Sequence, residues 1–192
     1  MCYCKDCQAF AHFLGNSGAV LDAMGGTDVV ATLQKNVTFS GGLNSLACMS
    51  LSSGGMLRWY ASCCNTPIGN TPRNFKVSHV GLVHTCLKDV KHAAESLDAS
   101  FGPVRMRVNT GSANAKGKGK PKAMPISTIT SVVRFLASLV RARLDGSYRR
   151  TPFFDRKRGT PIVAPRVLTR SERERVTNGF PLGPIEADVN AA

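Results

Sequence analysis

Three cysteines stand close together at the beginning of the chain. Cys2, Cys4 and Cys7 fall within six residues in a Cys-x-Cys-x-x-Cys spacing. Zinc binds thiolate sulfur at about 2.3 Å in a tetrahedral shell, and ligands this close in the chain can wrap a single ion. Three protein ligands leave one position of the shell open, which is typical of a reactive zinc rather than a structural one. The spacing therefore predicts a zinc site formed by these three thiols.

The sequence leaves the identity of a fourth ligand open. The candidates are His12, Cys48, Cys63, Cys64 and Cys86. Of these, Cys48 and Cys86 stand in apolar, strand-like segments and are expected to be buried, inert thiols. The alternative interpretation of the N-terminal motif is a set of thiols that binds no metal.

The cysteine content and the N-terminus favour a reducing compartment. The chain has seven cysteines, an odd number, and its N-terminus lacks the apolar core of a secretory signal. Both observations disfavour a disulfide framework, so we expect a cytoplasmic protein. No apolar run approaches the roughly 18 residues that cross a bilayer, so no membrane-spanning segment is expected.

The formal net charge of +13 is unevenly distributed along the chain. Residues 1–115 hold nine of the 25 lysines and arginines, and the other sixteen follow Ala115. This asymmetry and the composition predict four parts: a domain over residues 1–115, a basic linker over 116–126, an amphipathic helix over 127–145 and a basic, Pro- and Arg-rich tail over 146–192. The tail is expected to be loosely ordered.

The front domain is expected to be mainly β. Runs of apolar and β-branched residues predict strands at Val29–Leu33, Val37–Phe39, Leu46–Leu51, Met56–Tyr60 and within Val77–Leu87. Residues 65–73 are rich in turn formers and predict an irregular connection. The residues after Cys7 predict a short helix or loop that ends at Gly15.

The clearest helix of the chain is predicted over Ser127–Leu144, with Ser127 as its cap. Apolar residues at helical spacing form one stripe: Ile129, Val132, Val133, Leu136, Leu139, Val140 and Leu144. We expect this stripe to pack on the sheet domain or on a partner. An anionic membrane surface is the alternative.

A second cysteine cluster, Trp-Tyr-Ala-Ser-Cys-Cys-Asn-Thr-Pro over residues 59–67, follows the predicted strands. Together with the N-terminal motif and the run Phe-Gly-Pro-Val-Arg-Met-Arg-Val-Asn-Thr-Gly-Ser from Phe101, it resembles an uncharacterised bacterial branch of the glutathione-dependent formaldehyde-activating enzyme and centromere-protein-V family. The resemblance covers roughly residues 1–113. It implies an antiparallel, zinc-binding β-tent and a carbon–sulfur lyase that acts on glutathione–aldehyde adducts, with the adduct bound near Cys2, Cys4 and Cys7.

The resemblance also implies a second, structural zinc site, from which this chain departs. In that family the site uses an upstream Cys-x-Cys pair and a downstream Cys-x-x-Cys pair. Here the upstream pair is missing and Ala61 fills the first downstream position, so that only Cys64 matches, with Cys63 as its neighbour. We therefore expect a start that is truncated relative to the family, and a doubtful second site at Cys64.

The sequence assigns no catalytic residue and no oligomeric state. Glutathione carries two carboxylates that arginines could bind, but Arg58, Arg73, Arg105 and Arg107 are each better interpreted as residues on a solvated face. Two other functions remain open. One is a non-catalytic, metal-stabilised interaction module. The other is a polyanion binder, such as a nucleic-acid binder, that acts through the basic tail, although a flexible soluble extension is the favoured interpretation of that tail.

Overall fold

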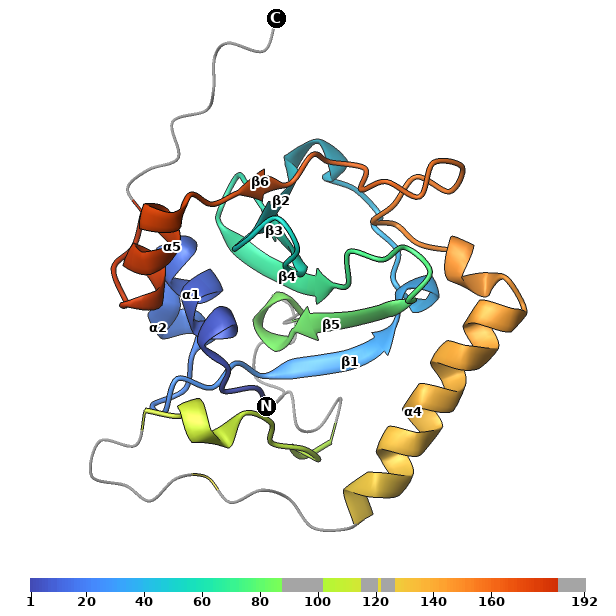
Figure 1. The fold of residues 1–192 in the computed structure, drawn as a ribbon, viewed down its shortest axis with the longest axis horizontal. Coiled ribbons are helices and arrows are strands. Elements are labelled where there is room, and N and C mark those ends of the chain that lie inside the picture. The colour runs from blue at the N-terminus through green and yellow to red at the C-terminus, as the bar shows by residue number, and fades with distance from the viewer. Residues whose placement is uncertain (88–101, 115–120, 122–126, 183–192) are drawn as a thin grey trace, which may run out of the picture.

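The computed structural model describes residues 1–87, 102–114, 121 and 127–182 and places a six-stranded sheet at the centre of the protein (Figure 1). The strands are β1 (Val29–Leu33), β2 (Leu46–Ser50), β3 (Leu57–Ala61), β4 (Thr66–Thr71), β5 (His79–Val83) and β6 (Arg166–Val167). The helices are α1 (Lys5–Phe13), α2 (Ser17–Val20), α4 (Ser127–Leu144) and α5 (Arg170–Thr177). Short 3-10 turns occupy Gln34–Asn36, Leu43–Ser45, His84–Leu87, Thr110–Ser112 and Ser147–Arg149.

The sheet is mixed, whereas an antiparallel one was expected. Its strand order is β1-β5-β4-β3-β2-β6, and the first five strands pair antiparallel. The sixth strand, β6, runs parallel to β2, with Met49 opposite Arg166. A parallel neighbour requires a long crossover, and here the chain between β2 and β6 includes β3, β4, β5 and α4.

The predicted strands are largely confirmed, with two errors. β1 has its predicted bounds, and β2, β3 and β5 lie within or close to theirs. The segment 37–39 is not a strand, whereas β4 occupies part of the region that was interpreted as an irregular connection. β4 tolerates its turn-forming residues for local reasons. Pro67 lies beside a register shift in the β3–β4 pairing, where the ladder is interrupted. A Cβ on Gly69 would meet the Gly81 carbonyl oxygen at 2.8 Å, so glycine permits the close approach of β5.

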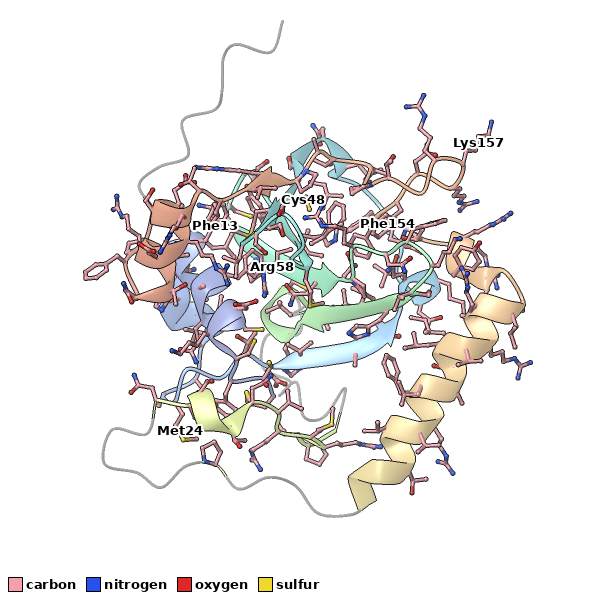
Figure 2. All side chains as sticks on the ribbon, viewed as in Figure 1. Phe13, Met24, Cys48, Arg58, Phe154 and Lys157 are labelled. Atoms are coloured by element: carbon pink, nitrogen blue, oxygen red, sulfur yellow. The ribbon has the colours of Figure 1, made fainter. Side chains whose placement is uncertain are left out.

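Both faces of β3 are covered, because its side chains alternate between two separate cores. Leu57 and Trp59 pack on one face with Phe153 and Phe154. The next residue, Tyr60, points the other way and joins the core formed with α1 and α5. Figure 2 shows Phe154 and Phe13, which belong to the two cores, on opposite sides of this region.

The expectation of a loosely ordered tail is wrong for residues 146–182. Phe153 is fully buried, with its ring centroid 5.1 Å from that of Trp59. The chain then forms β6 and the capped helix α5, whose Val176 is buried against the α1 core. The basic and proline-rich composition suggested disorder, but the few apolar residues of this segment fill gaps that the front of the chain leaves on both faces of the sheet.

The helix α4 has its predicted bounds and lies at one edge of the molecule (Figure 1). It contacts the sheet through Phe135, whose ring centroid is 5.2 Å from that of His79, and it buries Ala142. The predicted stripe does not pack as a whole, because several of its residues are exposed. Among the helices of the described ranges, none combines the length and the apolar character needed to cross a membrane.

Candidate metal centre

The three N-terminal cysteines are brought to one place by two different elements. Cys2 lies in extended backbone that bridges Thr27 on one side and Val108 on the other. Cys4 is the N-cap of α1, and Cys7 lies in the first turn of that helix. The sulfur atoms of all three lie within 4.8 Å of one another. The structure therefore brings together the three thiols that the spacing grouped, and metal binding by them stays a prediction.

The spacing of the sulfurs fits one tetrahedral ion. Sulfurs bound at 2.3 Å to a tetrahedral zinc lie about 3.8 Å from each other. The Cys7 and Cys2 sulfurs are 3.8 Å apart. Three thiols in so small a space also form a soft donor set, which thiophilic metals prefer. The cluster thus has the donor atoms and the dimensions of a metal site, although these do not by themselves identify the metal.

Hydrogen bonds around the cluster stabilise negative charge on sulfur. The Cys4 sulfur accepts the Cys7 backbone N–H at 3.3 Å, and it faces the N-terminus of α1, where the helix dipole favours an anion. The Asn109 side-chain amide donates to the Cys2 sulfur at 3.6 Å. These contacts come from the helix α1 and from a segment about a hundred residues away in the chain, so the site depends on the packing of these two segments.

The three thiols share their protons unequally. Hydrogen bonds from the Cys4 and Cys7 thiols hold the pKa of Cys2 well below its ordinary value. The same bonds raise the pKa of Cys4 and of Cys7, because each gains a bond to Cys2 as long as it keeps its proton. The cluster therefore favours one thiolate with two neighbouring thiols until a metal displaces the remaining protons.

Arg58 is buried between β3 and the helix α1, contrary to the expectation of a solvated face. It is only 3% exposed and projects from β3 toward α1, with its guanidinium carbon 5.5 Å from the Phe10 ring centroid (Figure 2). It donates to Asn70 Oδ1 at 3.0 Å, and its nearest carboxylate oxygen, on Asp6, is 3.8 Å away. The Arg58 charge acts to lower the pKa of Cys7, against the larger effect of the Cys2 hydrogen bond.

The sequence contained little signal for this burial. Arg58 stands in an apolar strand, but alternation places it on the face opposite Trp59, and this face is closed by the packing of α1. The other arginines differ from it. Arg105 is exposed, as expected, whereas Arg107 is half-buried, and so is Arg73, which donates to the Gly55 carbonyl at 3.3 Å.

Within the described part of the chain, none of the candidate fourth ligands joins the three thiols. His12 lies farther along α1, close to Gly179. Cys48 is buried in the core on the Trp59 face, where burial raises its pKa to about 12. Cys86 donates to the Ile68 carbonyl, and burial raises its pKa to about 11. The prediction that Cys48 and Cys86 are inert is consistent with these high values.

The other two cysteines are exposed in the connection between β3 and β4. The Cys63 and Cys64 sulfurs lie 3.6 Å apart, and the Cys64 sulfur is 3.1 Å from the Thr66 hydroxyl, which lowers the pKa of Cys64. Within the described ranges no third ligand gathers around this pair. The second zinc site expected at Cys64 therefore has no completed donor set in these ranges.

Comparison with known proteins gives one family match. No curated protein and no solved structure matches the chain. One family model, described as a family of unknown function, matches residues 1–164 and so spans the cysteine cluster, the linker and the buried aromatic residues of the tail. This family names no activity, and the resemblance to formaldehyde-activating enzymes stays a prediction. Since the match extends over most of the sequence, the chain belongs to the DUF6151 family.

Proposed function

We propose that the protein binds one zinc ion through Cys2, Cys4 and Cys7 and catalyses carbon–sulfur chemistry on adducts of a thiol, such as glutathione, with an aldehyde. The observation that carries this proposal is the placement of three sulfurs within 4.8 Å at the start of α1. A zinc ion held there would supply Lewis acidity toward an oxygen atom or a binding position for a substrate sulfur. The reaction is the addition of a thiol to a carbonyl carbon. The S–H proton passes to the carbonyl oxygen as the carbon–sulfur bond forms, and the reverse step breaks that bond.

The burial of the three thiols favours a reactive centre. Cys7 is buried and anchors the site, whereas Cys2 and Cys4 are only half-buried. An open position in the shell, together with ligands accessible to solvent, is typical of a zinc that meets a substrate. Asn109 lies at the same edge and can orient the Cys2 sulfur through its amide.

A structural role for the metal is the second candidate. Cys2 is bonded through its backbone to Thr27, and the adjacent Tyr3 N–H bonds to the Val108 carbonyl. An ion held by Cys2 and by the start of α1 would connect the helix to the N-terminal segment and, through that segment, to the backbone at Thr27 and Val108. This arrangement supports a metal-stabilised interaction module. The polyanion-binding alternative stays a prediction, because basic residues of the folded segment 146–182, such as Arg150 and Lys157, are exposed.

Metal analysis and turnover on the full chain test the proposal. Protein purified under reducing conditions is expected to contain about one zinc per chain. The Cys4→Ser variant should lose the metal, whereas Cys63→Ser, at an exposed thiol outside the cluster, should keep it. Formation of the adduct from glutathione and formaldehyde, followed by NMR, should be accelerated by the wild type and by Cys63→Ser only.

The possible results separate the candidates. Zinc binding without turnover of any aldehyde–thiol pair would favour the structural role. A well-folded wild-type protein that binds no thiophilic metal would rule out both the catalytic and the structural role of a metal.

A further inference from the structure

The helix α4 has two apolar sides, and the sheet uses only one of them. On the inner side, Phe135 contacts His79 and Ala142 is buried. At about 100° per residue, these two residues point in nearly the same direction from the helix axis. The helix is therefore fixed to the molecule by this inner side, near which Leu139 is also half-buried.

The outer side carries an exposed apolar stripe, defined here as Val133, Leu136, Val140 and Leu144. These residues are between 53% and 82% exposed. Their spacing of three, four and four residues places them on one narrow strip along the helix. Scattered exposed apolar residues are ordinary, but four in a row on one helix face mark an interaction surface.

Arginines border the exposed stripe on both sides. From the helical angle, Arg134 and Arg141 lie about 80–100° to one side of Val133, and Arg143 lies about 80° to the other. All three are exposed, and Arg143 also places its guanidinium carbon 5.4 Å from the Tyr148 ring centroid. An apolar strip with cations along both borders is the pattern of helices that lie in the interface of a membrane, because long cationic side chains can reach the headgroups while the strip enters the acyl region.

We propose that α4 docks the protein on an anionic lipid bilayer, with the exposed stripe inserted at the surface and the helix parallel to it. The positive charge of the protein favours an anionic bilayer as the partner of this stripe. The chain carries +13, and four lysines at alternate positions from Lys116 to Lys122 shortly precede the helix in the sequence. Such a cluster adds attraction to anionic lipid.

A flat surface suits this stripe better than another protein does. A second copy would bring the same arginine borders and another +13 into contact, which opposes pairing. The helix α4 lies at one edge of the molecule (Figure 1), so a planar bilayer can reach the stripe and both arginine borders at once.

Co-sedimentation of the full chain with vesicles tests the inference. The wild type is expected to bind vesicles made of equal parts phosphatidylcholine and phosphatidylglycerol and to leave pure phosphatidylcholine vesicles unbound. A stripe variant, Val133→Ser with Leu136→Ser and Val140→Ser, keeps every charge and should bind about tenfold or more weakly. A control variant, Leu43→Ser with Met56→Ser and Ile162→Ser, removes exposed apolar residues elsewhere and should bind like the wild type.

Two results would overturn the inference. One is equal vesicle binding by the stripe variant and the wild type, since the attraction would then come from charge alone. The other is absence of vesicle binding by a folded wild type. A concentration-dependent dimer in sedimentation velocity, lost in the stripe variant, would in that case assign the stripe to a second copy. Circular dichroism of each variant confirms that the fold is kept.

Discussion

Arg58 carries a full positive charge in a place that is closed to water. Its nearest carboxylate, on Asp6, is mostly exposed and 3.8 Å away, so this ion pair does not neutralise it closely. Three thiolates around a divalent metal leave one net negative charge in the same region. The Arg58 charge would balance such a metal centre, and a bound metal would in turn offset the cost of burying Arg58.

Replacing Arg58 by methionine tests this pairing. The Arg58→Met variant keeps most of the volume but removes the charge, so we expect its zinc affinity to fall by about tenfold to a hundredfold, as for other residues that support metal ligands. Competition with a chromogenic chelator measures this affinity on protein shown to be folded. Arg170→Met, at an exposed ion pair with Glu174, is the control and should bind zinc like the wild type. Unchanged affinity in Arg58→Met would separate Arg58 from the metal.

Zinc binding should also depend on pH in a direction set by the thiol protons. The pKa values of Cys4 and Cys7 are raised by their bonds to Cys2, so both thiols are protonated in the metal-free protein near neutral pH. A metal that binds three thiolates must displace those protons, and its affinity must therefore rise with pH. We expect about two protons released per zinc near neutral pH. Calorimetry in buffers of different ionisation enthalpy measures this number, and release of no protons would contradict ligation by these thiols.

At the scale of elements, α1 explains why the candidate site was predictable. Its thiols lie next to one another in the sequence, so a local helix start is enough to gather two of them, and Cys2 is only two residues away. Asn109 and Arg58 could not be assigned to the site from spacing, because they arrive from distant segments through tertiary packing. The cysteine cluster could therefore be predicted from the sequence, whereas the residues that contact or surround it from distant segments could not.

The contact between α4 and the sheet contains a titratable group. Burial lowers the pKa of His79 below its ordinary value of 6.5, and its ring packs against Phe135. The fold therefore favours the neutral imidazole. This contribution to stability is fully present above the unfolded pKa and is lost as the pH falls through the lower, folded pKa.

We expect the free energy of unfolding to decrease as the pH is lowered from about 7 to about 5, in part through His79. A His79→Phe variant keeps an aromatic ring without the charge, and its unfolding free energy should depend less steeply on pH. Some slope will remain, because burial lowers the pKa of His12 as well. Urea unfolding of both proteins at several pH values measures the pH dependence of the unfolding free energy. Identical slopes in the two proteins would refute a role for His79.

At the scale of the whole molecule, the C-terminal segment completes the fold. After α4 the chain fills the Trp59 face of the sheet with Phe153 and Phe154, adds β6 to β2 and places α5 beside α1. The helix α1, whose start holds Cys4 and Cys7 of the cysteine cluster, is thus supported from the far end of the chain. The composition of the segment did not indicate this structural role, because charged and turn-forming residues outnumber the few apolar residues that pack in the core. The adjacent residues Phe153 and Phe154 were the feature of the sequence that could have predicted it.

The dependence of the fold on this segment gives the last prediction. Phe153→Ala should lower the free energy of unfolding by about 3–5 kcal/mol, because the ring is fully buried against Trp59 and its loss leaves a cavity. Phe180→Ala, at a phenylalanine in the same segment that is 63% exposed, is the matched control and should change stability by about 0.5 kcal/mol or less. Denaturant unfolding followed by Trp59 fluorescence measures both, since this is the chain's single tryptophan. A chain that ends at residue 145 should fail to unfold cooperatively. Cooperative unfolding of that shortened chain, with wild-type stability, would show that the first 145 residues need no support from the rest.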